Sequence, residues 1–122
     1  MNTTVMQPQF CDIYFAELLG DENIQAGKRP VVIAQNNIGN MHSRTVEVIP
    51  MSSRINKAKY MPTHVLVRPT RENGLTAISI VLAEQVVTIN KKRLLRFIGR
   101  LDHVELVSIG EARKIQSPFP TR

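Results

Sequence analysis

Short apolar segments alternate along this chain with polar stretches rich in Gly, Pro and Asn. The apolar segments are four to eight residues long and rich in Val, Ile, Tyr and Phe, which is typical of β-strands. Asn36 to Asn40 and the pair Asn73-Gly74 carry strong turn signals. We therefore expect strands at 12–19, 29–35, 45–50, 64–67, 78–82 and 86–89.

The last quarter of the chain has a different pattern. Residues 94–101 fit either a strand or a helix, although Gly99 argues against a long helix. Asp102 and Glu105 have the spacing of a capping box, and apolar residues at helical spacing follow until Pro118. The sequence thus predicts a mainly β fold with a C-terminal α-helix, in which a small barrel or curled sheet carries the helix.

The chain length of 122 residues suits one domain. We expect a flexible segment at 1–10, the folded domain at 11–117 and a short tail at 118–122. The N-terminus lacks the pattern of a signal peptide, and no apolar stretch approaches the ~18 residues of a membrane span. The single cysteine, Cys11, fits a reducing compartment. A cytoplasmic protein without membrane contact is the expectation.

The net charge of +6 favours a polyanionic partner, although charge alone fits a merely soluble protein equally well. The three histidines are isolated from one another, so no metal site is indicated, and no cofactor is expected. Phosphate-binding glycine loops and nucleophile elbows are also missing from the sequence. What remains is a set of basic and hydroxyl residues on neighbouring segments, namely Lys28, Arg29, Ser52, Ser53, Arg54, Lys57 and Lys59.

Such a set matches what a phosphodiester site in RNA requires. The RNA supplies its own nucleophile, the 2′-hydroxyl, so the protein has only to align the groups, stabilise charge and manage two protons. Arg29 follows a long polar loop and precedes Pro30, which fixes it at the start of a strand. Two structural alternatives stay open. The basic loops can simply be solvated, and Arg29 can be an ion-pair partner of Asp12 or Glu17.

Several separate motifs occur in an order that resembles the MazF/PemK toxin endoribonucleases of type II toxin–antitoxin systems. They are the segments 12–18, 25–33, 35–40, 55–59, 62–65 and 82–89, and the similarity runs from about Asp12 to Ile115. The chain is most similar to MazF members of low-GC Gram-positive bacteria. This resemblance implies an SH3-like barrel of the CcdB/PemK type and a homodimer. It also implies a MazE-like antitoxin whose tail occupies the RNA groove.

The resemblance further implies sequence-specific, metal-independent cleavage of single-stranded RNA. The products would carry 2′,3′-cyclic phosphate and 5′-hydroxyl ends. The family's catalytic arginine falls on Arg29, and its catalytic threonine falls on Ser52. As candidate RNA contacts we take Lys28, Ser53, Arg54, Lys57, Lys59, His64 and Gln85.

Four positions depart from the family pattern. Cys11 replaces a glycine before the aspartate, so the first strand can start differently. Ile24 stands at an acidic position of the loop before Arg29, and Arg54 stands where glutamine is usual. Ser52 keeps the hydroxyl of threonine but loses the methyl group that restricts its rotamer.

These departures keep an alternative open, namely a catalytically weakened module that binds RNA or antitoxin. Gyrase poisoning, as in the fold-related CcdB proteins, is disfavoured because the chain contains no Trp. His64 can act as an acid–base group, but a structural role is the favoured interpretation.

Overall fold

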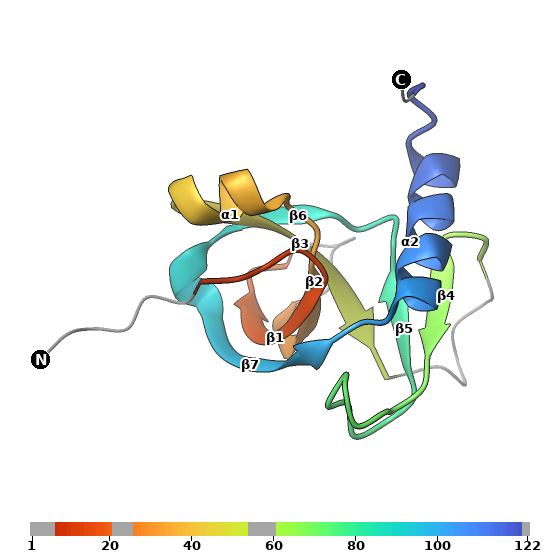
Figure 1. The fold of residues 1–122 in the computed structure, drawn as a ribbon, viewed down its shortest axis with the longest axis horizontal. Helices are drawn as coiled ribbons and strands as arrows, with labels where there is room; N and C mark the ends of the chain where they lie inside the picture. Colours follow the sequence, from red (N-terminus) through yellow and green to blue (C-terminus); the bar gives the residue numbers. More distant parts are fainter. Residues whose placement is uncertain (1–6, 21–25, 54–60, 121–122) are drawn as a thin grey trace, which may run out of the picture.

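The computed structural model describes residues 7–20, 26–53 and 61–120. Figure 1 shows a curled β-sheet with a short helix at one end and a long helix at the other. Its elements in chain order are β1 (Asp12–Leu18), β2 (Gly27–Ile33), α1 (Asn37–His42), β3 (Thr45–Ser52), β4 (His64–Val67), β5 (Ser79–Leu82), β6 (Val87–Asn90), the 3-10 turn η1 (Lys91–Arg93), β7 (Leu94–Arg100) and α2 (His103–Gln116).

All strand pairs are antiparallel, and the strands follow the order β4-β5-β3-β2-β1-β7, with β6 paired to β3. The first half of β3 pairs with β6, and its end, Met51 and Ser52, pairs with β5. The two end strands, β4 and β7, do not pair with each other, so the sheet does not close into a complete barrel. The expected class, mainly β with a C-terminal helix, is confirmed.

The central strands are buried on both faces, which explains continuous apolar runs such as Val31-Val32-Ile33. Side chains alternate between the two faces of a strand. Val32 packs in one hydrophobic cluster, beneath α2, with Ile13, Ile49, Met51 and Ile109 among others. Its neighbours Val31 and Ile33 pack in a second cluster, inside the curl, with Tyr14, Val46, Val48 and Leu94 among others. The sheet therefore separates two cores.

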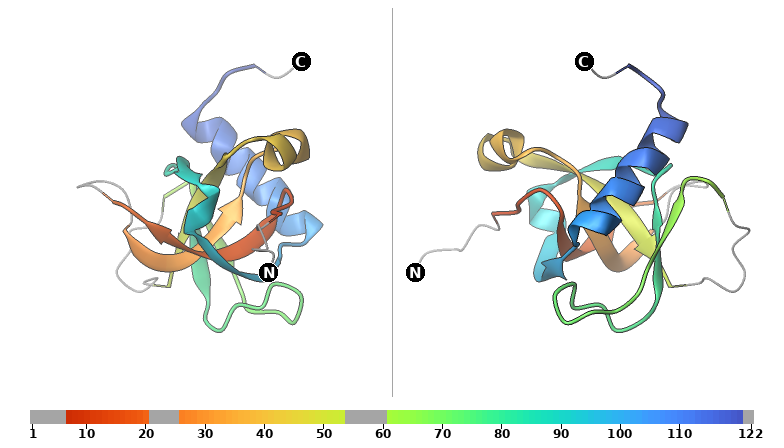
Figure 2. Two further views of the ribbon diagram at one scale, coloured as in Figure 1. Left: turned by 90° about the vertical axis from the view of Figure 1, so that its left-hand side faces the viewer. Right: turned by 45° about the vertical axis from the view of Figure 1, so that its right-hand side comes forward.

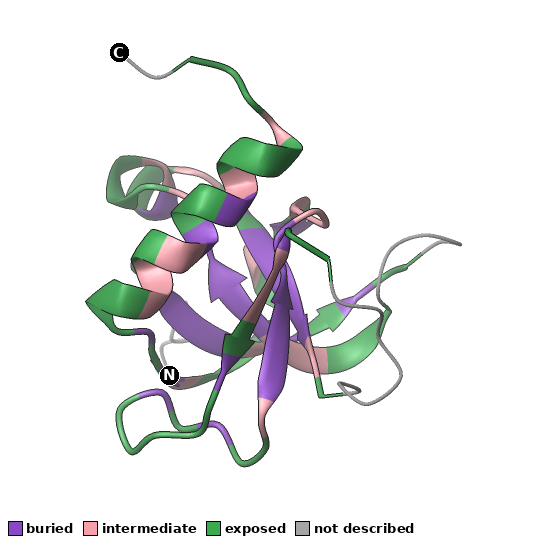
Figure 3. Ribbon diagram, turned by 90° about the vertical axis from the view of Figure 1, so that its right-hand side faces the viewer, coloured by how far each residue is buried: buried purple, intermediate pink, exposed green. Residues whose placement is uncertain are grey.

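Helix α2 closes the first of these cores. Asp102 accepts a hydrogen bond from the Glu105 amide at 2.8 Å, and the Glu105 carboxylate accepts one from the Asp102 amide at 3.0 Å, which confirms the predicted capping box. Figures 2 and 3 show α2 lying across the outside of the sheet, with buried residues on its inner side. Those residues are Ile109 and Ala112. No helix in the described ranges is long and apolar enough to cross a membrane.

The structure decides three local expectations. The predicted turn at 36–40 is wrong, because Asn36 instead caps helix α1 by accepting a hydrogen bond from the Gly39 amide at 2.9 Å. Residues 94–101 fitted either element, and Leu94–Arg100 form strand β7 by pairing with β1. The strand expected at 45–50 continues to Ser52, which is the last residue of β3.

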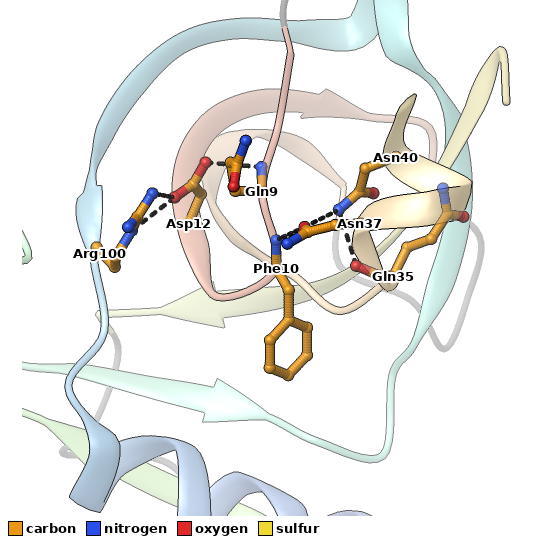
Figure 4. Close-up of polar contacts among 7 residues, drawn as sticks. All are labelled: Gln9, Phe10, Asp12, Gln35, Asn37, Asn40 and Arg100. Atoms are coloured by element: carbon orange, nitrogen blue, oxygen red, sulfur yellow. Dashed lines mark hydrogen bonds and ion pairs between the residues drawn. The ribbon is translucent and has the colours of Figure 1, made fainter. Parts of the chain in front are cut away.

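Hydrogen bonds around β1 hold the chain that precedes it (Figure 4). The buried Asp12 carboxylate accepts bonds from the Gln9 amide at 2.8 Å and from Arg100 Nε at 3.0 Å. The Asn37 side chain accepts a bond from the Phe10 amide at 2.7 Å. Cys11, between them, adopts a φ of 74°, which is the left-handed conformation that glycine reaches freely.

Candidate functional site

A cleft of about 400 Å³ opens where the ends of β2 and β3 meet the face of β1 and β7. Cationic and hydroxyl side chains are spread around its wall, and none of its described lining residues is acidic. It is lined by Phe15, Lys28, Arg29, Pro30, Met51, Ser52, Ser53, Gly74, Leu75, Thr76, Ala77, Ser79, Arg96 and Ile98. This composition favours an anionic ligand that also presents flat or apolar surface.

Arg29 is held in the cleft by backbone carbonyls from two segments. Its Nε and Nη2 donate to the Ala26 carbonyl at 3.2 and 2.8 Å, and its Nη1 donates to the Met51 carbonyl at 3.2 Å. The side chain is half-buried, and the following Pro30 continues β2. These bonds fix the guanidinium between the start of β2 and the end of β3.

Ser52 lies next to this anchor. It is the last residue of β3, where it pairs with Ile80 of β5. The carbonyl that receives the Arg29 bond belongs to Met51, the residue immediately before Ser52. Arg29 and Ser52 therefore line one cleft, and the exposed Lys28 and Ser53 stand beside them.

Sequence reasoning missed several residues of the cleft. Phe15 and Arg96 are register partners on β1 and β7, and both line it. Arg96 lies in the segment whose element type was ambiguous, so its direction could not be assigned from the pattern. Thr76 and Ser79 come from the connection between β4 and β5 and from the start of β5. No motif marked them.

His64 and Gln85 do not line this cleft. His64 pairs with Leu82, at the opposite end of β5 from Ser79. Its Nε2 lies 3.3 Å from Glu84 Oε2, and the side chain is only 9% exposed. Glu84 Oε1 also accepts a bond from the Thr63 hydroxyl at 3.0 Å. This buried polar group supports the structural interpretation of His64.

Asp12, the first residue of β1, has its own cationic partner. Asp12 Oδ1 lies 2.9 Å from Arg100 Nη2, so the carboxylate considered as a partner of Arg29 is paired with another arginine. This pair also affects the neighbouring thiol. Burial raises the pKa of Cys11, the charge of Arg100 opposes that rise, and the charge of Asp12 adds to it.

Comparison with known proteins gives the family. The model of the PemK-like, MazF-like toxins of type II toxin–antitoxin systems matches residues 9–116. This chain belongs to the PemK/MazF-like toxin family. Endoribonuclease EndoA of Bacillus subtilis is 42% identical over 107 residues, covering 85% of this chain and 89% of the relative.

Solved structures agree with this assignment. The Mycobacterium tuberculosis toxin MazF-mt6 has a TM-score of 0.74 at 25% identity, covering 90% of this chain and 99% of that one. A crystal structure of MazF from Deinococcus radiodurans has a TM-score of 0.79 at 17% identity, covering 93% and 99%, which shows the shared fold. The resemblance stated from the motifs is thereby confirmed.

Arg54, Lys57 and Lys59, and the Ile24 position, lie outside the described residues. Among residues 7–20, 26–53 and 61–120, no three His, Cys, Asp or Glu side chains gather in a group that could hold a metal ion.

Proposed function

We propose that this toxin-family chain is an endoribonuclease that cuts single-stranded RNA in the cleft between β2 and β3. The observation that carries the proposal is the position of Arg29. Its guanidinium is bonded to the carbonyl that precedes Ser52, and both residues line a cleft whose described wall holds no carboxylate. A phosphodiester in that cleft would meet a fixed cation and a hydroxyl together.

The reaction uses the RNA's own nucleophile. The 2′-oxygen attacks the adjacent phosphorus and loses its proton, the bond from phosphorus to the 5′-oxygen breaks, and the 5′-oxygen gains a proton. The products are a 2′,3′-cyclic phosphate and a 5′-hydroxyl. Arg29 stabilises the charge on the non-bridging oxygens, because a guanidinium keeps its charge and suits that geometry better than it serves as an acid. Ser52 donates a hydrogen bond to the same group.

Other parts of the proposal rest on family membership. The toxin is expected to act as a homodimer in the cytoplasm, to need no metal or cofactor, and to cut at a specific short sequence. Its cognate partner is a MazE-like antitoxin that covers the RNA groove. The name of EndoA, an endoribonuclease 42% identical to this chain, supports the activity. Lys28 and Ser53 at the same cleft are proposed as further RNA contacts.

The test is cleavage of a long single-stranded RNA by the purified protein in EDTA. Discrete fragments with cyclic-phosphate ends are expected from the parent. Arg29→Ala is expected to lower the rate by about 10²–10³-fold, the loss seen when one charge-stabilising donor is removed. The matched control is Arg44→Ala, because Arg44 is exposed and lies outside the cleft lining.

Ser52 variants separate the enzyme from the weakened binding module. Ser52→Thr keeps the hydroxyl and should retain or raise activity, whereas Ser52→Ala should lose most of it. RNA that stays intact with the parent yet shifts on a gel would instead indicate the module. Cleavage by Arg29→Ala at the rate of the parent would refute the assignment of the site.

A further inference from the structure

Arg96 and Phe15 form a pair on the β1–β7 side of the cleft. They are register partners, and Phe15 also faces Pro30 of β2, so the three residues form a row across β7, β1 and β2. All three line the cleft that contains Arg29. Because neighbouring strands lie about 4.8 Å apart, this row brings Arg96 within a short span of the start of β2.

The guanidinium carbon of Arg96 lies over the Phe15 ring, 5.1 Å from its centroid. Attraction between the cation and the face of the ring holds an otherwise exposed side chain at the cleft. Among the described residues no carboxylate forms an ion pair with Arg96. Within the described residues, the positive charge of Arg96 is therefore not neutralised by an ion pair.

An arginine held against an aromatic ring is a combination suited to single-stranded nucleic acid. Unpaired bases stack on aromatic rings and on guanidinium planes, and this stacking is tolerant of base identity because every base has a flat face. An acidic protein segment would gain from the charge of Arg96 but would make no particular use of the ring. The half-buried Phe15 thus favours RNA as the occupant.

We infer that Arg96, supported by Phe15, binds the base of a nucleotide that flanks the scissile phosphate at Arg29. This inference rests on the proposed function, because it takes RNA as the ligand of the cleft. Arg96 is here a substrate-binding residue and not a catalytic one, since it lies across β1 from the start of β2. Its contribution is binding that is equal in the ground state and the transition state, so it lowers KM without changing kcat.

The experiment compares Arg96→Ala, Arg96→Lys and the control Arg44→Ala in cleavage of an RNA that spans one mapped cut site. Arg96→Ala is expected to raise KM by about tenfold, the size of one lost stacked base, with kcat unchanged. Arg96→Lys keeps the charge but loses the plane, so its KM should also rise. Arg44→Ala should leave both constants near those of the parent. Thermal unfolding of each variant checks that the fold is intact.

Binding to the same RNA with 2′-O-methyl groups, followed by fluorescence anisotropy, tests the pair without cleavage. If the parent cleaves no RNA but Arg96→Ala binds single-stranded RNA about tenfold more weakly, the proposed catalysis fails and only the contact of Arg96 with an RNA base stands. If the parent cleaves and Arg96→Ala keeps its affinity, the inference fails and the proposed function stands. Full recovery by Arg96→Lys would show a simple charge contact and overturn the stacking site. The same anisotropy measurement can be made with the MazE-like antitoxin. If Arg96→Ala loses antitoxin binding while its RNA binding is unchanged, the inference is also overturned.

Discussion

The ion pair between Asp12 and Arg100 links the start of β1 to the end of β7, and its removal has a calculable effect. The Asp12 side chain is 3% exposed, whereas that of Arg100 is 55% exposed. Arg100→Met leaves the buried carboxylate with the hydrogen bond that it accepts from the Gln9 amide at 2.8 Å, but without its cationic partner. Because hydrogen bonds to charged groups are worth about 1.5–3 kcal/mol, we expect a loss of about 2 kcal/mol of unfolding free energy.

The opposite substitution should cost less. Asp12→Asn leaves the half-exposed Arg100 to be solvated by water, and the asparagine oxygen can still accept from Gln9. A loss of about 1 kcal/mol is expected, and the double variant should lose about the same, because it contains no buried unpaired charge. The two single changes are therefore expected to be strongly non-additive.

Urea unfolding at one fixed protein concentration measures this cycle, because a toxin that dimerises would otherwise change stability with concentration. For a domain of this size a change of 1 kcal/mol corresponds to about 3–5 °C in Tm, which gives a second readout. If the two single losses simply add in the double variant, Asp12 and Arg100 are not coupled and the reasoning is wrong. An Arg100→Lys variant serves as the control that keeps the charge.

Three further outcomes follow from the backbone and the single thiol. Gly110→Ala should raise the unfolding free energy by about 0.5–1 kcal/mol in thermal unfolding, because a Cβ at this position of α2 would meet nothing within 4 Å. Gly99→Ala should lower the unfolding free energy by more than about 2 kcal/mol, because its Cβ would lie 2.4 Å from the Asn73 carbonyl. Cys11→Gly should gain about 0.5 kcal/mol by relieving the positive φ, whereas Cys11→Ala should gain nothing; equal melting temperatures for both would contradict the strain argument. Because burial raises the pKa of Cys11, its alkylation by iodoacetamide should be slower at pH 8 than that of an unfolded peptide and should accelerate only at higher pH; a midpoint below that of the peptide would be inconsistent with a buried thiol.

The site shows how far the residue pattern reaches. Arg29 and Ser52 could be singled out because Pro30 fixes the start of a strand and because the motifs occur in family order. Arg96 could not be found this way, since a basic residue in a segment of uncertain type has no predictable direction. His64 attracted attention as a titratable group, but its contact with Glu84 lies away from the cleft.

Local chemistry decided much of the fold from the sequence alone. Apolar runs bounded by turn residues marked most strands, and Asp102 with Glu105 marked the start of α2, because a cap needs only the residues beside it. The tertiary structure decided what depends on distant partners. Leu94–Arg100 became β7 by pairing with β1, and Arg29 reached the Met51 carbonyl, next to Ser52, because β2 and β3 pair in one register. Such pairings join residues far apart in sequence, and their free energy comes from burial and hydrogen bonds that no local pattern contains.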